Sequence, residues 1–170
     1  WINTDRSLGA EPGSFASENV RFENGTLMKM SGGDVVFSAN RGVRFENAGT
    51  VGGDGGMIWN GVVSGSGDFN KVGGLTMSLG ANNSYSGNIS VNQGTLEVQG
   101  DGKLQNGNYN GSVSITGDGT FRYSGNGGQT QIMNGAISGD RELRKEGGGS
   151  TLTLANNNSG FNGFVNIQDG

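Results

Sequence analysis

One stretch of the chain occurs twice, and this internal repeat constrains the fold more than any other feature. Residues 59–94 read WNGVVSGSGDFNKVGGLTMSLGANNSYSGNISVNQG, and residues 133–170 read MNGAISGDRELRKEGGGSTLTLANNNSGFNGFVNIQDG. Asn60 corresponds to Asn134, and Tyr85 corresponds to Phe161. The offset between the copies therefore grows slightly along the repeat, because turns absorb single-residue insertions. Apolar residues, glycines and asparagines keep their places while the other positions vary. Such a repeat preserves architecture rather than chemistry.

Between the turns, the sequence follows the period of two that is typical of half-buried β-strands. Short blocks alternate apolar and polar side chains, among them Val20–Phe22, Val43–Phe45, Leu75–Leu79, Ile89–Val91, Val113–Ile115, Leu152–Leu154 and Val165–Ile167. Glycine, asparagine, aspartate and serine separate the blocks, and these residues favour tight turns. Glycine supplies 36 of the 170 residues, and no window has helical periodicity. The chain is therefore predicted to be all-β, with helix essentially absent.

Two all-β architectures are compatible with such strands. A sandwich or barrel uses longer strands joined by hairpin turns, whereas a β-solenoid uses very short strands on coils that stack in parallel. The short strands and the repeat favour a single continuous β-solenoid over residues 1–170, with about seven or eight coils of roughly 20 or more residues. Inward apolar side chains would stack on like residues of neighbouring coils. The asparagines of residues 82–83 and 156–158 would form stacked amide ladders.

The two ends of the chain interrupt the pattern. In the first copy of the repeat Gly94 leads directly into the strand Thr95–Val98, whereas the second copy stops at the equivalent Gly170. The chain is therefore expected to be a fragment of a longer solenoid. Turn residues punctuate the N-terminal stretch, and the side chains expected to be buried there are Ile2, Leu8 and Phe15.

Composition excludes several classes of function. Cysteine and histidine are both absent, which removes disulfides, thiolate nucleophiles, Cys/His metal sites and a histidine-dependent serine protease. The net charge of −4 is scattered and no basic patch occurs, so nucleic-acid binding is not expected. No apolar run reaches the roughly 18 residues of a membrane span, so this segment is not expected to insert into a membrane. A cysteine-free chain fits a secreted bacterial protein.

Residues 8–27 and 62–100 resemble the autotransporter-associated β-strand repeat, whose usual form is a strand followed by SGxGxLxKxGxGTLTLSGxNxYSGxTxVNxGTL. The likeness returns in residues 136–170 and leaves about 101–135 less clearly assigned. The resemblance implies a right-handed parallel β-helix in a large bacterial surface or secreted protein, typically the passenger of a type V secretion system. It also implies display, adhesion or spacing, because the family's repeat carries no catalytic residues. The charged run at 140–146 departs from the family pattern.

Aspartates that follow glycine recur along the chain and are the most obvious candidates for metal binding: Asp54, Asp68, Asp101, Asp118 and Asp140. Calcium sites of the nonapeptide type need tandem GGxGxD units, and these aspartates are not so spaced. We interpret them as turn residues that bind their own backbone. No metal, cofactor or catalytic residue is predicted.

Two other groups of residues have a functional and a structural interpretation. The charged run at 140–146 could be a protein-binding spot, but a solvated strand face is favoured, with Leu143 turned inward and equivalent to Phe69 in the first copy. Several aromatic residues could form a platform for sugar rings, but packing in the core or at corners is favoured; they are Trp1, Trp59, Tyr85, Tyr109, Tyr123 and Phe161.

These observations favour a structural role over catalysis. The first hypothesis is a display or spacer segment of an extracellular or bacterial cell-surface β-helix, such as an adhesin or virulence-associated passenger. Its partners would be a surface protein or glycan of a host or neighbouring cell. End-to-end stacking into a fibre is a variant of it, because open solenoid ends present unpaired strand edges. The alternative is a carbohydrate-binding or carbohydrate-cleaving β-helix, although the paired carboxylates that glycoside hydrolysis needs are not found.

Overall fold

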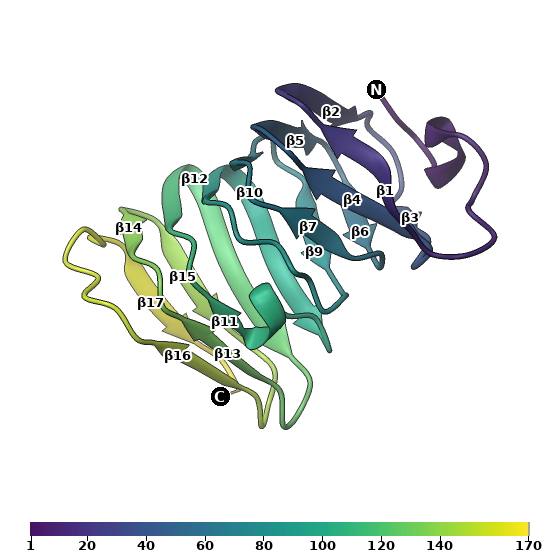
Figure 1. Ribbon diagram of the computed structural model, residues 1–170. Coiled ribbons are helices and arrows are strands. Elements are labelled where there is room, and N and C mark those ends of the chain that lie inside the picture. Colours follow the sequence, from purple (N-terminus) through teal and green to yellow (C-terminus); the bar gives the residue numbers. More distant parts are fainter. Residues whose placement is uncertain (170) are drawn as a thin grey trace.

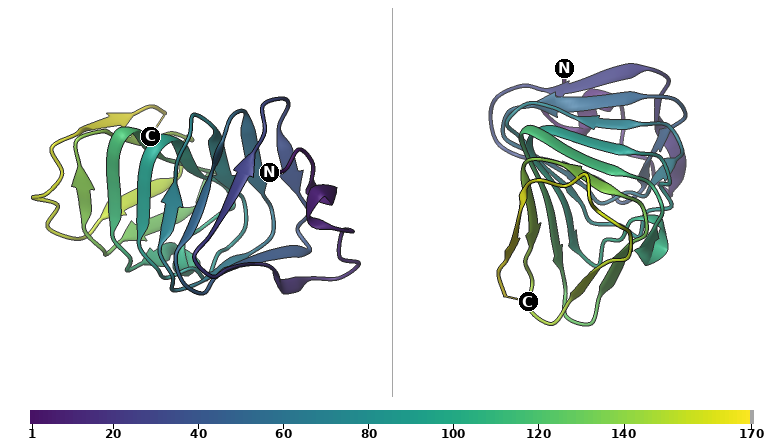
Figure 2. Two further views of the ribbon diagram at one scale, coloured as in Figure 1. Left: turned by 90° about the horizontal axis from the view of Figure 1, so that it is seen from above. Right: turned by 90° about the vertical axis from the view of Figure 1, so that its left-hand side faces the viewer.

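Short parallel strands wind the chain into a β-solenoid of about seven turns (Figure 1). The structure is a computed structural model and describes residues 1–169. Strands make up 53% of the chain and helix 4%, so the prediction of an all-β parallel solenoid is confirmed. The coils stack along one axis, with the N-terminal and C-terminal coils at opposite ends of the stack (Figure 2).

The coils form three faces, and the strands of the first face belong to two separate three-stranded sheets, because the coil that contains Tyr85 has no strand there. The first face carries β1 (Ala16–Phe22), β4 (Arg41–Phe45), β7 (Val63–Gly65), β11 (Asn108–Tyr109), β13 (Thr130–Met133) and β16 (Thr151–Leu154). The second carries β2 (Gly25–Lys29), β5 (Gly49–Gly53), β8 (Phe69–Lys71), the starts of β10 (Ile89–Gly100) and β12 (Val113–Gly125), and β14 (Ile137–Gly139). The third carries β3 (Val35–Phe37), β6 (Gly56–Trp59), β9 (Thr76–Leu79), the ends of β10 and β12, β15 (Glu142–Lys145) and β17 (Phe164–Ile167).

The coils differ in length, and this variation decides which face each sequence block occupies. Met77 pairs with Leu96 across a short coil, whereas Leu96 pairs with Phe121 across a longer one. Because β10 and β12 continue through a corner, the second and third faces form one 11-stranded sheet. Insertions at the turns are tolerated because the strands, not the turns, carry the register.

The internal repeat does not place equivalent residues on the same face. Val63 of the first copy pairs with Val43 on the first face, whereas its counterpart Ile137 pairs with Val113 on the second face. The offset between the two copies therefore corresponds to three full coils plus the step from the first face to the second. The expectation that the asparagines of its two copies stack in ladders is wrong for this reason: the two corners lie on different edges of the solenoid.

A column of aromatic rings runs through the core of the first five coils. Phe22 stacks on Phe45 with ring centroids 4.6 Å apart, and Phe45 lies 4.8 Å from Phe69. Tyr85 continues the column and stacks on Tyr109 at 6.3 Å. All five side chains are 4% exposed or less. The predicted stacking of inward apolar residues between coils is thus confirmed, with aromatic side chains filling the interior.

The N-terminal segment covers one end of the stack. Ile2 is buried and pairs with Lys29 at the free edge of β2, and the 3₁₀ helix η1 (Asp5–Leu8) contacts β3. Burial of Ile2 agrees with the sequence analysis, and Leu8 is half-buried against the core. Burial of Phe15 was wrong: its side chain is 51% exposed, because it lies in the connection that precedes β1. A second 3₁₀ helix, η2 (Gln105–Gly107), lies in the stretch that the repeat pattern does not cover.

Candidate functional site

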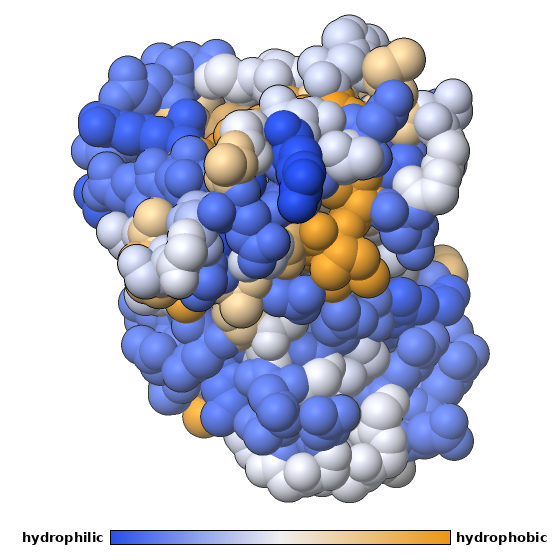
Figure 3. All heavy atoms as spheres, turned by 90° about the vertical axis from the view of Figure 1, so that its right-hand side faces the viewer, coloured by the Kyte–Doolittle hydropathy of each residue, from blue (hydrophilic) through white to orange (hydrophobic). Residues whose placement is uncertain are grey.

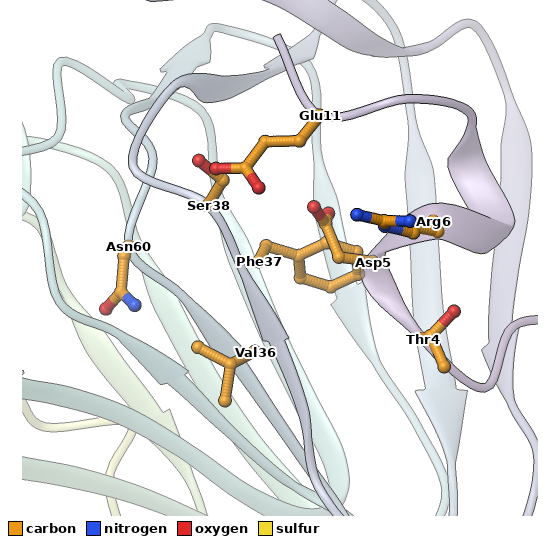
Figure 4. A pocket seen from close by; sticks show the side chains of 8 residues that line it. All are labelled: Thr4, Asp5, Arg6, Glu11, Val36, Phe37, Ser38 and Asn60. Carbon is orange, nitrogen blue, oxygen red and sulfur yellow. The ribbon is translucent and has the colours of Figure 1, made fainter. Parts of the chain in front are cut away.

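A shallow cleft lies beside the N-terminal segment. It has a volume of about 380 Å³ and is lined by Thr4, Asp5, Arg6, Glu11, Val36, Phe37, Ser38 and Asn60 (Figure 4). The first four residues come from the N-terminal segment and the others from β3 and the turns that follow β3 and β6. The cleft combines carboxylates, a guanidinium and the exposed side chain of Val36, so it can accept a small polar group.

A buried arginine fixes the wall of this cleft. Arg41 is 1% exposed, and its Nε donates to Asp5 Oδ1 at 2.5 Å while Nη2 donates to the other carboxylate oxygen at 3.4 Å. The same guanidinium donates to the side chain of Asn19 and to the carbonyls of Leu8, Gly9 and Ala10. Arg41 therefore ties the N-terminal segment to the first coils. Because Asp5 is bound to Arg41, the cleft does not offer two unengaged carboxylates for acid–base hydrolysis.

A lysine at the end of β8 occupies a corner lined by backbone carbonyls. Lys71 is 0% exposed, and its Nζ donates to the carbonyls of Val72 and Gly73 in its own turn and of Gln93 in the next coil, at 3.1, 2.8 and 2.8 Å. Burial lowers the pKa of Lys71 to about 8. The ammonium group therefore joins two successive turns where a hydrophobic side chain could not satisfy the carbonyls.

Buried lysines also donate to turn carbonyls at two other corners. Lys29 at the end of β2 donates to the carbonyl of Asp54 in the next coil at 2.9 Å. Lys145 is the counterpart of Lys71 in the second copy of the repeat, and it donates to the carbonyl of Gly147 in its own turn at 2.8 Å. All three lysines are buried. The lysine of the repeat pattern is thus a structural residue, not one exposed for binding.

The asparagines of the repeat are structural as well. Asn83 is fully buried, and its Oδ1 accepts the backbone N–H of Val63 at 2.8 Å while its Nδ2 donates to the carbonyl of Lys103 at 2.9 Å. In the second copy Asn158 Oδ1 accepts the backbone N–H of Ile137, also at 2.8 Å. The two copies therefore preserve one side-chain-to-backbone bond at two different corners.

An array of charged and hydroxyl side chains runs along the third face. Glu97 accepts from Ser124 at 2.5 Å and from Arg122 and Ser78 at 2.9 Å each. Burial alone would raise the pKa of Glu97, but the three hydrogen bonds outweigh it, and the pKa falls below its ordinary value. The carboxylate is therefore ionised and fully engaged at neutral pH.

The charged run at 140–146 continues this array into the last coils. Glu142 and Arg144 form an ion pair at 2.7 Å, Glu146 lies 3.4 Å from Arg144, and Asn166 donates to Glu142 at 2.9 Å. The hydrogen bond from Arg144 lowers the pKa of Glu142. Leu143 points inward and is 1% exposed, as predicted. The prediction of a solvated strand face holds only in part, since the side chains of Glu142 and Lys145 are buried.

The remaining sequence candidates lie in different environments. The five candidate aspartates are all exposed, and no group of three or more metal-ligating side chains occurs within residues 1–169. Asp68 and Asp101 accept side-chain hydrogen bonds from Asn88 and Asn126. Among the aromatic candidates, Trp1 is exposed and Phe161 is half-buried, whereas the others lie in the core as favoured: Trp59, Tyr85, Tyr109 and Tyr123.

The second face presents a regular column of short polar side chains. Consecutive coils place one outward hydroxyl or amide in register with the next, in the order Thr26, Thr50, Asn70, Ser90, Ser114 and Ser138. Neighbouring strands lie about 4.7–4.9 Å apart. The column is therefore a periodic row of uncharged hydrogen-bonding groups that runs along the solenoid axis.

Two sequence signals could have revealed the inward charged residues and the stacking of the first coils. Arg41, Lys71 and Lys145 each stand two residues from an inward apolar side chain in the same strand, so the period of two already indicates that they point inward. The second signal is the pentapeptide VRFEN, which occurs at 20–24 and again at 43–47. The two copies lie one coil apart, and their first three residues pair with each other, ending with the phenylalanines.

Comparison of the chain with protein-family models, curated proteins and solved structures finds no significant match. Within residues 1–169, no helix is both long and apolar enough to cross a membrane. Function is therefore inferred from the chain's own residues and geometry.

Proposed function

We propose that this chain is a structural display segment of a bacterial extracellular or cell-surface β-solenoid, which holds a functional region away from the cell and contacts partners through its lateral faces. The observation that carries the proposal is that the buried residues able to do chemistry are engaged in structural bonds. The arginine and lysines with inward side chains bind turns, and Glu97 is held by three donors.

The solenoid core is built to resist bending. A single hydrophobic cluster extends from Ile2 to Leu143, so each coil packs on the next. Seven coils spaced by one strand separation give a rod of roughly 30 Å. The resemblance to the autotransporter-associated repeat supports the same role, because Lys71, Asn83 and Tyr85 of its pattern make internal contacts. Display and spacing need this rigidity.

A display experiment tests the proposal. The chain is placed between an outer-membrane anchor and an epitope in a Gram-negative host, and a dye on the epitope reports its distance from a lipid dye on intact cells. We expect protease-resistant surface display and a narrow distance distribution that is about 30 Å longer than without the chain. A Gly/Ser linker of equal length is the control and should give a broad distribution. Retention inside the cell, or a distribution as broad as the linker's, would refute the proposal.

Carbohydrate binding is a second candidate, and the polar column of the second face favours it. A row of hydroxyls and amides with a constant spacing can form repeated hydrogen bonds with a polysaccharide that lies along the axis. Ser90→Arg would block the middle of the row, and Thr76→Arg on the third face is the matched control. Glycan-array binding that is lost in the first variant and kept in the second would support this candidate. The absence of binding by the unmodified chain would eliminate it.

A further inference from the structure

The cleft between the N-terminal segment and β3 opens on the side of the solenoid. Val36, in the middle of β3, pairs with Ile58 of the next coil and points outward from the third face, where its side chain is 52% exposed. Ser38 and Asn60 follow β3 and β6 in these same two coils. The cleft therefore lies on the lateral surface of two adjacent coils, and its lining does not depend on how many coils the stack contains.

Two charged side chains of this cleft are free to meet a ligand. Arg6 and Glu11 are both exposed, and neither side chain forms an ion pair or a hydrogen bond with any residue from 1 to 169. Asp5, by contrast, already binds Arg41, whose Nε lies 2.5 Å from the carboxylate. The charges that remain available are thus one guanidinium and one carboxylate. A ligand with a single charge would leave one of them unpaired, whereas a zwitterion matches both.

Polar and apolar groups occupy different sides of the cleft. In Figure 4, Glu11 and Ser38 lie at one side and Val36 lies at another, while Arg6 enters from the N-terminal segment. Figure 3 views the molecule from the side of the N-terminal segment and shows a patch of apolar surface surrounded by hydrophilic side chains. Small-molecule sites typically combine apolar contacts with a few polar groups that fix the orientation of the ligand. A ligand in this cleft would contact charged groups and an aliphatic side chain together.

We propose that this cleft binds a free α-amino acid with an apolar side chain. Glu11 accepts hydrogen bonds from the α-ammonium group, Arg6 donates to the α-carboxylate through its planar guanidinium, and the side chain of the ligand lies against Val36. The cleft volume of about 380 Å³ is near the lower end of the roughly 300–1,000 Å³ of ligand pockets, so it suits a small ligand. This inference goes beyond the display role and does not depend on it.

Titration of the purified chain with L-leucine, followed by NMR, tests the inference. We expect saturable chemical-shift changes in the amides of residues 4–11 and 36–38, and none in those of β16. N-acetyl-leucine lacks the positive charge, leucinamide lacks the negative charge, and glycine lacks the apolar side chain. Each analogue should bind about tenfold more weakly than leucine, which corresponds to about 1.4 kcal/mol. These comparisons use the unmodified chain, so they do not require any variant to fold.

Two variants identify the groups that hold the ligand. Arg6→Gln and Glu11→Gln each remove one charge from the cleft, and each should weaken leucine binding about tenfold. Arg21→Gln and Glu23→Gln are the matched controls, because these two residues form an exposed ion pair outside the cleft, and they should bind leucine as the unmodified chain does. The inference is overturned if leucine causes no saturable shifts, if any of the three analogues binds as tightly as leucine, or if the cleft variants and the control variants bind equally.

Discussion

Replacing Lys71 by methionine tests whether the corner lysines stabilise the coil stack. Methionine is unbranched and flexible and keeps the apolar stem in the corner, but it removes the donor from the carbonyls of Val72, Gly73 and Gln93. A hydrogen bond to a charged group contributes about 1.5–3 kcal/mol, and the cost of burying the ammonium offsets part of the sum of three. We therefore expect the free energy of unfolding to fall by about 3 kcal/mol.

Urea unfolding at pH 7, followed by the fluorescence of the buried Trp59, measures this loss as a shift in midpoint at constant slope. Lys103→Met is the matched control, since Lys103 is only half-buried. We expect the control substitution to change the free energy of unfolding by no more than about 0.5 kcal/mol. If Lys71→Met and Lys103→Met unfold at the same urea concentration, the corner lysine does not stabilise the fold.

The pH dependence provides an independent check. The folded pKa of Lys71 is about 8, below the value of 10.5 expected for a lysine in the unfolded chain. Between these pH values the unfolded chain binds more protons than the folded one, so the stability contributed by this lysine rises with pH. The difference in stability between the unmodified chain and Lys71→Met should therefore widen from pH 8 to pH 10. A difference that stays constant or narrows would contradict the assigned burial of the ammonium.

Three further predictions concern other bonds of the structure. Asn83→Ala should cost about 2–3 kcal/mol, because the backbone N–H of Val63 and the carbonyl of Lys103 lose their partner. Asn158→Ala should cost less, since Asn158 is only half-buried, and thermal unfolding of both variants checks this order. Arg41→Met should release the N-terminal segment, seen as faster protease cleavage within residues 1–15 while the coils stay resistant; equal cleavage rates would show that the arginine does not hold it. The lowered pKa of Glu97 means that its contribution is present above about pH 4.3 and is lost as pH falls through the folded value. Glu97→Gln should therefore show a shallower acid transition than the unmodified chain, measured by circular dichroism.

The architecture could be predicted because local pattern and fold agree. The alternation of apolar and polar residues determines which side chains point inward, as Leu143 illustrates. Glycine-rich turns determine where the strands end. Short parallel strands can bury such side chains only when coils stack, so the solenoid follows from strand length and the repeat.

The role of the repeat in the coil could not be predicted in the same way. The nearly constant offset between its two copies suggests stacked equivalents, yet the repeat corresponds to three coils and one further face. The unequal lengths of the coils decide this, and they depend on how each turn packs. Because of the same variation in coil length, the sequence did not predict that Glu97 lies beside Arg122 on the next coil.

The sequence by itself determined the all-β class, the parallel stacking and the inward positions, because these depend on the period of two and on turn residues a few positions apart. Only the tertiary structure decided the faces of the two repeat copies, the carbonyl partners of Lys71 and the binding of the N-terminal segment by Arg41. Each of these depends on contacts between residues about one coil or more apart, whose register is set by the sum of all the turns between them.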